Sequence, residues 1–127
     1  MKIAVSSEDG SSVSGHAGQA RLWLLYQAEP GQEPGAPQRV ELDRGQVFHH
    51  FAGGVPHPLD GVNVIISASA GDGFLRRMRK RGVQVVLTSE KDSAGAVAGV
   101  LSGHTLPERR WDLFQYICTL RDLFSTH

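Results

Sequence analysis

One stretch constrains the fold of this chain more than any other: residues 62–75, with the sequence VNVIISASAGDGFL. It begins as an apolar, β-branched run, passes through small residues and a Gly-x-Gly, and continues with residues that favour a helix. We interpret it as a buried strand, a glycine turn and a helix. Backbone N–H groups at the start of such a helix lack partners within the helix and can bind an anion. A tight turn without any ligand is the alternative interpretation.

The rest of the pattern predicts an α/β domain. Apolar runs at 2–6, 21–27 and 39–43 are expected to be strands, and because they follow one another closely we expect an antiparallel meander. From residue 62 onward the pattern changes to strand, helix, strand and helix, with the second of these strands at 83–87. A parallel return through a right-handed crossover is therefore expected. A further helix is predicted from 107 to about 124, with a wide apolar face.

Length and charge exclude several classes of protein. A chain of 127 residues, 40% of them hydrophobic, fits one globular domain. Its 13 basic and 13 acidic side chains cancel, so no global field favours nucleic acid or an anionic membrane surface. No apolar run approaches the ~18 residues of a membrane span, and no signal-peptide pattern is seen, so we expect a cytoplasmic protein. The single cysteine, Cys118, excludes an all-cysteine metal site within one chain.

Histidine is the residue type that points to chemistry. Of six histidines, His16, His49, His50 and His57 fall in predicted loops, and His16 lies between closely spaced glycines. The loop at 45–58 is about a dozen residues long, a length that is usually functional or disordered. Histidine commonly binds iron, zinc or copper, and these loops could meet the glycine turn at one end of the sheet. Solvated loop histidines are the alternative, since none shows the helical spacing of a closed metal site.

Other candidate groups carry less weight. Glu8, Asp9, Asp60 and Asp72 are scattered over loops, whereas a two-metal nuclease needs converging carboxylates. Because Asp9 and Asp72 could both lie near strand ends, a weak site there is left open. The basic run at 76–81 is interpreted as a solvated helix face, with charges that suit the helix C-terminus.

Several segments together resemble a known family. They are MKIAVSSEDG at 1–10, VSGHAGQA at 13–20, LLY at 24–26, the glycine turn with Phe74 and Leu75, GVQVV at 82–86 and the helix at 96–103. In order and spacing they resemble the dinitrogenase iron–molybdenum cofactor biosynthesis family over roughly residues 1–103. The resemblance implies an α/β, ribonuclease-H-like three-layer fold. Its mixed five-stranded sheet would have three antiparallel strands followed by parallel ones, flanked by helices. Residues 1–103 would form the cofactor-binding core, and 104–127 a C-terminal helical extension of the same domain.

The resemblance also implies a function. It suggests a non-enzymatic carrier that binds an iron–sulfur or molybdenum–iron–sulfur cluster, or a precursor, and delivers it to metallocofactor assembly or target proteins. The residues expected to bind the cofactor are His16, Gly18, Gly71, Asp72 and Gly73, and those expected to ligate metal are His16, His49, His50 and His57. Two alternatives are kept: a ribonuclease-H-type metal-dependent hydrolase, and a protein-binding module acting through the C-terminal helix, which could also form a homodimer.

Overall fold

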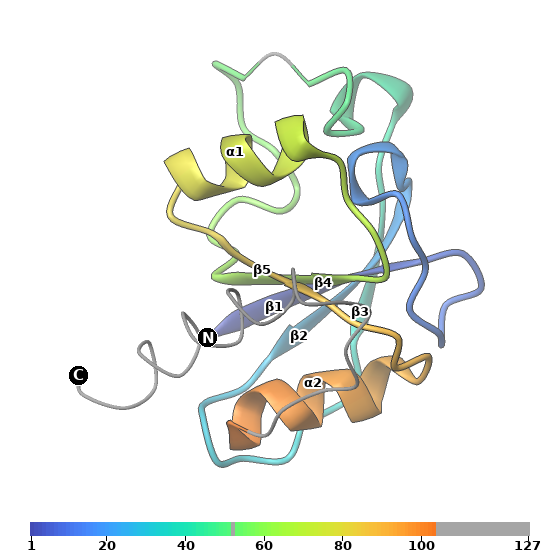
Figure 1. The fold of residues 1–127 in the computed structure, drawn as a ribbon, viewed down its shortest axis with the longest axis vertical. Coiled ribbons are helices and arrows are strands. Elements are labelled where there is room, and N and C mark those ends of the chain that lie inside the picture. Colours follow the sequence, from blue (N-terminus) through green and yellow to red (C-terminus); the bar gives the residue numbers. More distant parts are fainter. Residues whose placement is uncertain (52, 104–127) are drawn as a thin grey trace.

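The computed structural model describes residues 1–51 and 53–103. In this part of the chain a five-stranded sheet lies between two helices, as Figure 1 shows. The elements are β1 (Lys2–Ser7), β2 (Leu22–Gln27), β3 (Gln38–Glu41), β4 (Val64–Ser67), α1 (Asp72–Lys80), β5 (Gln84–Leu87) and α2 (Ser93–Ser102), with short 3₁₀ turns η1 (Ala17–Gln19) and η2 (Arg44–Gln46). The predicted helix at 107–124, and Cys118 within it, lie outside the described residues.

The sheet has the order β3-β2-β1-β4-β5. β1 pairs antiparallel with β2, and β2 pairs antiparallel with β3, which confirms the predicted meander. β4 pairs in parallel with both β1 and β5, so the mixed five-stranded sheet is also confirmed. The carboxyl ends of the two central parallel strands, β1 and β4, therefore lie side by side at one end of the sheet. Ligands of open α/β sheets usually bind at this end.

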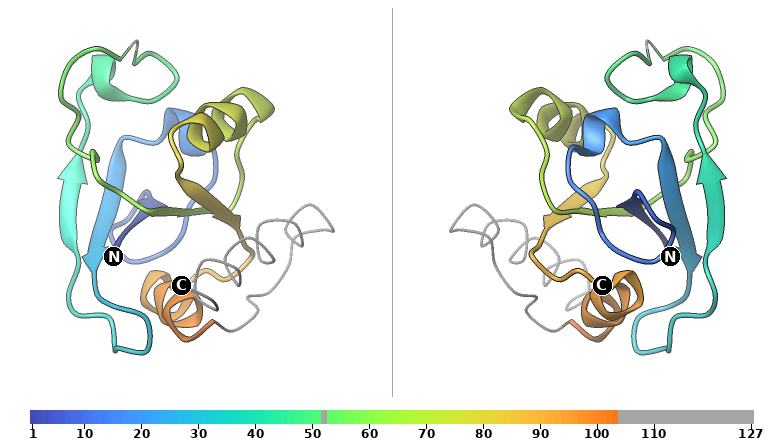
Figure 2. Two further views of the ribbon diagram at one scale, coloured as in Figure 1. Left: turned by 90° about the vertical axis from the view of Figure 1, so that its left-hand side faces the viewer. Right: turned by 90° about the vertical axis from the view of Figure 1, so that its right-hand side faces the viewer.

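The central strands are apolar on both sides because each face of the sheet is covered by a helix. In β1, Ile3 and Val5 pack toward α2, whereas Ala4 packs toward α1. The same alternation holds in β4, where Val64 and Ile66 share a core with α2. Figure 2 shows α2 on one side of the sheet, with α1, η1 and the segment around η2 on the other.

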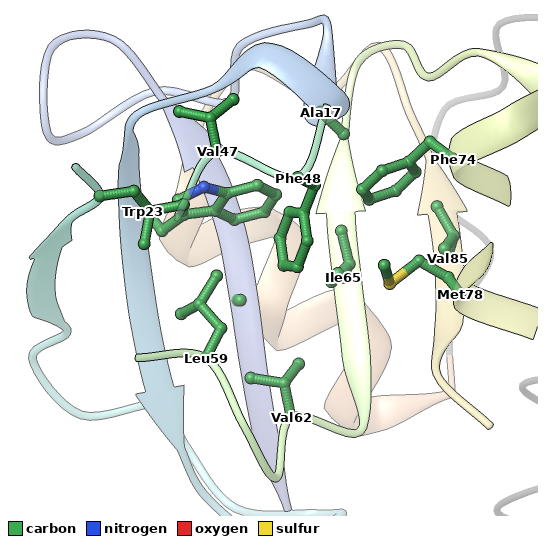
Figure 3. Close-up of a cluster of buried hydrophobic side chains, with 12 residues drawn as sticks. Ala17, Trp23, Val47, Phe48, Leu59, Val62, Ile65, Phe74, Met78 and Val85 are labelled. Atoms are coloured by element: carbon green, nitrogen blue, oxygen red, sulfur yellow. The ribbon is translucent and has the colours of Figure 1, made fainter. Parts of the chain in front are cut away.

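The core on the α1 side is built around Phe48 (Figure 3). Its ring centroid lies 5.7 Å from that of Trp23 and 5.6 Å from that of Phe74, both in edge-on geometry. Such aromatic contacts add to the hydrophobic burial of the ring. The segment at 45–58 is thus a loop, as predicted, but Val47 and Phe48 anchor it in the core.

The helices begin and end where the sequence indicates. α1 follows Gly71 and buries Phe74 and Met78, with Gly82 at φ 74° just beyond its end. This positive φ is the left-handed conformation in which glycine commonly terminates a helix. α2 is capped by Asp92, whose carboxylate accepts a hydrogen bond of 2.8 Å from the N–H of Gly95. Neither helix of the described chain is long and apolar enough to cross a membrane.

Candidate functional site

A cavity of about 470 Å³ lies between α1, η1 and the loop that carries Phe48. Three separate segments meet there, at the edge of the sheet to which the carboxyl end of β4 points. The lining residues are His16, Gly18, Gln19, Phe48, His49, Gly71, Gly73, Phe74 and Arg77. The structure thus brings together the His16 loop, the glycine turn and part of the second histidine loop, three segments that lie far apart in the sequence.

His16 is held in an unusual backbone conformation. With φ 56° and ψ 56°, it is the one non-glycine residue with positive φ in the described chain. Left-handed geometry is disfavoured for a residue with a side chain and persists where its surroundings impose it. Here Ser69 supplies that constraint, because its Oγ accepts the N–H of His16 at 2.7 Å and its carbonyl accepts the N–H of Ala17 at 3.0 Å.

A buried serine cluster ties the His16 loop to the two central strands. The N–H of Ser14 donates to the carbonyl of Ser6 at 2.8 Å, and the carbonyl of Ser14 accepts from Ala68 at 2.9 Å. The hydroxyls of Ser6 and Ser67 lie 2.8 Å apart, and both are within hydrogen-bond distance of the Ser14 carbonyl. Both serines are fully buried, so the loop is fixed to the ends of β1 and β4 by satisfied polar contacts.

Gly15 is required by this arrangement. A Cβ atom placed there would lie 2.6 Å from the hydroxyl oxygen of Ser69. The same hydroxyl holds His16 in position, so a larger residue at position 15 would disturb the neighbouring histidine directly.

The glycine turn supplies the second wall of the cavity. Gly71 is the N-cap of α1, with extended φ −80° and ψ 164°, and it has no side chain to cap the helix. The first intrahelical bond runs from the N–H of Leu75 to the carbonyl of Gly71 at 3.1 Å. The N–H groups before it have no such partner, as at any helix start. A Cβ at Gly71 or Gly73 would meet no atom of residues 1–51 and 53–103 within 4 Å, so within this part of the chain there is open space at the start of α1.

The third wall carries His49 and meets Arg77 of α1. The N–H of His49 donates to the carbonyl of Gly18 at 2.6 Å, which fixes this loop to η1. The guanidinium of Arg77 donates to the carbonyl of Phe48. The sequence does not predict Arg77 as a site residue, because the basic run to which it belongs is typical of a solvated helix face. Its spacing of four residues, one helical turn, from Gly73 is the signal that would have identified it.

Among the described residues that line the cavity, the one charged side chain is a cation. The polar side chains there are two imidazoles, one guanidinium and one amide, and none of these described lining residues carries a carboxylate. Asp72, which the sequence placed in the site, occupies the first turn of α1, where it complements the helix dipole, but it does not line the cavity. An anionic ligand is the kind that such a cavity favours.

The two remaining predicted histidines lie elsewhere. His50 is exposed, with its ring centroid 5.0 Å from that of His49, but it does not line the cavity. His57 is buried, and its ring stacks on Phe48. Its Nδ1 accepts the N–H of Leu59 at 3.0 Å, and its Nε2 lies 2.7 Å from the carbonyl of Gln46. Both ring nitrogens of His57 thus have protein partners, which gives this residue a structural role in the loop.

Two further observations concern metal chemistry. In residues 1–51 and 53–103, no group of three or more His, Cys, Asp or Glu side chains is placed to hold a metal ion. The carboxylate of Asp9 accepts hydrogen bonds from the Ser12 hydroxyl and from the N–H groups of Ser11 and Ser12. These bonds hold the pKa of Asp9 well below its usual range. Asp9 therefore stabilises the turn that contains Ser11 and Ser12, which we call the serine turn.

A second, smaller hollow of about 310 Å³ shares His16 and Gln19 with the cavity. Glu8 and Arg21 are among its other lining residues. His16 therefore borders both hollows.

Comparison with known proteins identifies the family. The family described as "Dinitrogenase iron-molybdenum cofactor" matches residues 1–103, and the chain belongs to it. The resemblance seen in the sequence is thereby confirmed over the residues on which it rested. No curated protein matches the chain.

Solved structures support the fold. The crystal structure of a protein named PH0822 is similar with a TM-score of 0.69 and 18% identity, over 88% of this chain and 99% of the other. A candidate dinitrogenase from Methanocaldococcus jannaschii matches with a TM-score of 0.60 and 14% identity, over 80% and 88% of the two chains. The solution structure of a Thermotoga protein described as a candidate NifB protein gives a TM-score of 0.51 and 17% identity, over 86% and 98%. At these identities the likeness concerns the α/β fold alone.

Proposed function

We propose that this protein is a non-enzymatic carrier of an anionic metal–sulfur cluster in nitrogenase-related metallocofactor biosynthesis. The cargo would be an iron–sulfur or molybdenum–iron–sulfur cluster or a precursor, handed on to assembly or target proteins in the cytoplasm. The observation that carries this proposal is the composition of the cavity, which His16, His49 and Arg77 line together with the glycines at the start of α1, with no carboxylate among the lining residues that the structure describes. Family membership supports the cofactor class, and we keep the ribonuclease-H-like assignment as part of the proposal.

The size of the cavity favours a cluster over a single ion. Its volume of about 470 Å³ falls in the range of roughly 300–1,000 Å³ that small-molecule sites occupy. A water molecule takes a share of only about 30 Å³ in the liquid, so a single metal ion would leave most of the cavity unfilled. Imidazoles on separate loops provide few ligands, which suits a cargo that must later be released.

The sulfur would arrive with the cargo. Iron–sulfur clusters are ordinarily held by cysteine thiolates, and residues 1–103 contain no cysteine. We infer that the protein receives a preassembled cluster whose sulfides remain bound to its metals. His16 would replace one exchangeable ligand of a cluster metal, a substitution in which nothing is oxidised or reduced. Arg77 and the N–H groups of α1 would stabilise the negative charge.

An anaerobic titration with a synthetic cubane iron–sulfide cluster that carries exchangeable thiolates tests the proposal. One equivalent should bind to the full chain with a change in the visible spectrum. His16→Ala should weaken binding by at least about tenfold, as loss of a metal-site partner commonly does. His50→Ala is the matched control, because His50 is exposed beside His49 but does not line the cavity. Failure of the unaltered chain to bind, or equal weakening by both substitutions, would overturn the proposal.

A second titration separates charge recognition from ligation. Tetrathiomolybdate is an anion without an exchangeable ligand, so His16 cannot bind its metal by simple replacement. We expect Arg77→Gln to weaken its binding more than His16→Ala does, since the guanidinium acts on charge. The reverse order would show that the cavity does not recognise anions through Arg77.

A further inference from the structure

We propose that α1 presents a docking surface for an acidic protein partner, formed by a cationic stripe that begins at the cavity. We define the cationic stripe as Arg77, Lys80 and Arg81. The inference rests on the proposed function, because it is the partner receiving the cargo that would cover the mouth of the cavity. The inference adds to the proposed function that the surface of the partner protein is acidic.

Helical periodicity places the stripe and the cavity on the same side of α1. Gly73, Arg77, Lys80 and Arg81 follow one another at spacings of four, three and one residues, which project from one face of a helix. The first two of these residues line the cavity. Phe74 and Met78, which project in another direction, are buried against the sheet. The stripe is therefore the continuation of the cavity wall along the helix.

The loop opposite α1 faces the same stripe. The Cζ atom of Arg81 lies 5.7 Å from the centroid of the Phe51 ring, and Arg77 donates to the carbonyl of Phe48. Phe48 and Phe51 belong to the loop that forms another wall of the cavity. Two of the three cations of the stripe, Arg77 and Arg81, thus contact this loop from α1.

Within the described chain the stripe has no acidic partner. Its three side chains are exposed, and the ion pair found among residues 1–51 and 53–103 joins the N-terminus to Glu29. The chain as a whole has a net charge of zero, so this positive surface is local. The helix dipole favours cations near the end of α1, but it does not select the face that adjoins the cavity.

A protein that covers the cavity would also cover the stripe, because a protein interface is wider than α1 is long. α1 has nine residues and is roughly 14 Å long at the usual helical rise. A stable interface buries about 800 Å² on each partner, which spans more than this length. A protein that takes cargo from the mouth therefore also faces Lys80 and Arg81. An acidic surface there would speed association and select the partner, whereas a basic surface would be repelled.

Binding of a labelled glutamate-rich peptide to the full, cargo-free chain tests the inference. Lys80→Glu combined with Arg81→Glu should weaken binding at low salt by about tenfold or more, because two attractive charges become repulsive. Arg79→Glu combined with Lys91→Glu is the matched control. It makes the same change of charge at two exposed cations outside the stripe, and it should weaken binding by less than about threefold.

Other outcomes would overturn the inference. Equal weakening by both pairs would mean that the peptide responds to the overall charge of the chain. Tighter binding of a single-stranded RNA of equal charge, lost with the Lys80 and Arg81 changes, would identify a nucleic-acid surface instead.

Cluster binding is measured separately on the same variants. Retained cluster binding by the Lys80→Glu, Arg81→Glu chain, with peptide binding lost, supports a partner surface distinct from the cargo site. If the unaltered chain binds the peptide at the stripe but no cluster, the proposed function fails while the acidic-partner surface is upheld. If the unaltered chain binds the cluster but the Lys80 and Arg81 changes leave peptide binding unaltered, the further inference alone fails.

Discussion

The hydroxyl oxygen of Ser69 accepts a hydrogen bond of 2.7 Å from the backbone N–H of His16. The two residues are 53 positions apart in the chain, so this bond links the His16 loop to the segment that follows β4. It fixes the left-handed backbone of His16, which borders both hollows. In this chain the position of the proposed metal ligand is thus set by a serine that does not itself line either hollow.

Removing the Ser69 hydroxyl should distinguish the positioning of His16 from the proposed binding of a cluster metal by its side chain. We expect Ser69→Ala to lower the free energy of unfolding by about 1 kcal/mol, the usual net value of one hydrogen bond. Cluster affinity should fall further than this loss of stability alone would produce, because His16 is no longer held in its strained conformation. Urea denaturation and cluster titration of the same sample measure the two effects. Ser89→Ala, at an exposed serine, is the control, and unchanged affinity in Ser69→Ala would contradict the positioning role.

Gly73→Ala should change stability and binding in opposite directions. Gly73 lies in the first turn of α1, and alanine favours a helix over glycine by up to about 1 kcal/mol. A Cβ there meets nothing within 4 Å, so the protein should accept it and unfold at a higher urea concentration. The added methyl group enters the space proposed for the cargo, and cluster binding should weaken.

The control for this prediction is Gly35→Ala. A Cβ at Gly35 would also meet nothing within 4 Å, but this glycine lies in the connection between β2 and β3. Its substitution should leave cluster binding unchanged. If Gly73→Ala binds the cluster as tightly as the unaltered chain, the start of α1 is not part of the site.

The sheet and its helices were predictable because their signals are local. Apolar alternation, turn glycines and helix caps each act over a few residues, and the antiparallel meander of the first three strands followed from their closeness in the sequence. The pairing of β1 with β4 joins segments far apart in the chain and was not predicted. The cavity was only partly predictable. The sequence indicated that His16, His49 and the glycine turn could converge, but it could not tell His49 from His50, since both share the same loop and chemistry.

Arg77 and His57 show why the rest could not be predicted. The role of Arg77 depends on the orientation of α1 relative to a loop 29 residues away, a tertiary relationship that charge pattern alone does not contain. His57 resembles a loop histidine in sequence, yet Phe48 and two backbone partners bury it. In both cases the packing of one aromatic anchor, Phe48, decided the outcome.

The structural role of His57 predicts a large effect on stability. His57→Leu puts an apolar side chain of similar size in place of the imidazole and removes its hydrogen bonds to Gln46 and Leu59. We expect the free energy of unfolding to fall by about 2–3 kcal/mol, because one buried and one partly buried backbone group lose their partners. His50→Leu, at an exposed position in the same loop, should change it by less than about 0.5 kcal/mol. Equal shifts of the urea midpoint would show that His57 is not a packing residue.

Asp9 predicts how stability depends on pH. Hydrogen bonds from the Ser12 hydroxyl and from the N–H groups of Ser11 and Ser12 lower the pKa of its carboxyl in the folded state. A carboxylate with a depressed folded-state pKa stabilises the protein above the unfolded value, near pH 4, and this contribution is lost as the pH falls below about 4. Asp9→Asn removes the titration while keeping the shape of the side chain. We therefore expect it to lower stability at pH 7 and to flatten the decline between about pH 4 and about pH 2.

Urea midpoints measured across this range test the expectation for Asp9. Glu33→Gln is the matched control, since it removes one exposed carboxylate from a loop outside the serine turn. Its acid decline should follow that of the unaltered chain. Below pH 4 the stability of the Asp9→Asn protein could instead decline as steeply as that of the Glu33→Gln protein. This result would mean that other carboxylates cause the acid sensitivity. The hydrogen bonds of the serine turn would then contribute little to folding, because a depressed pKa necessarily makes the stability of the folded state depend on pH.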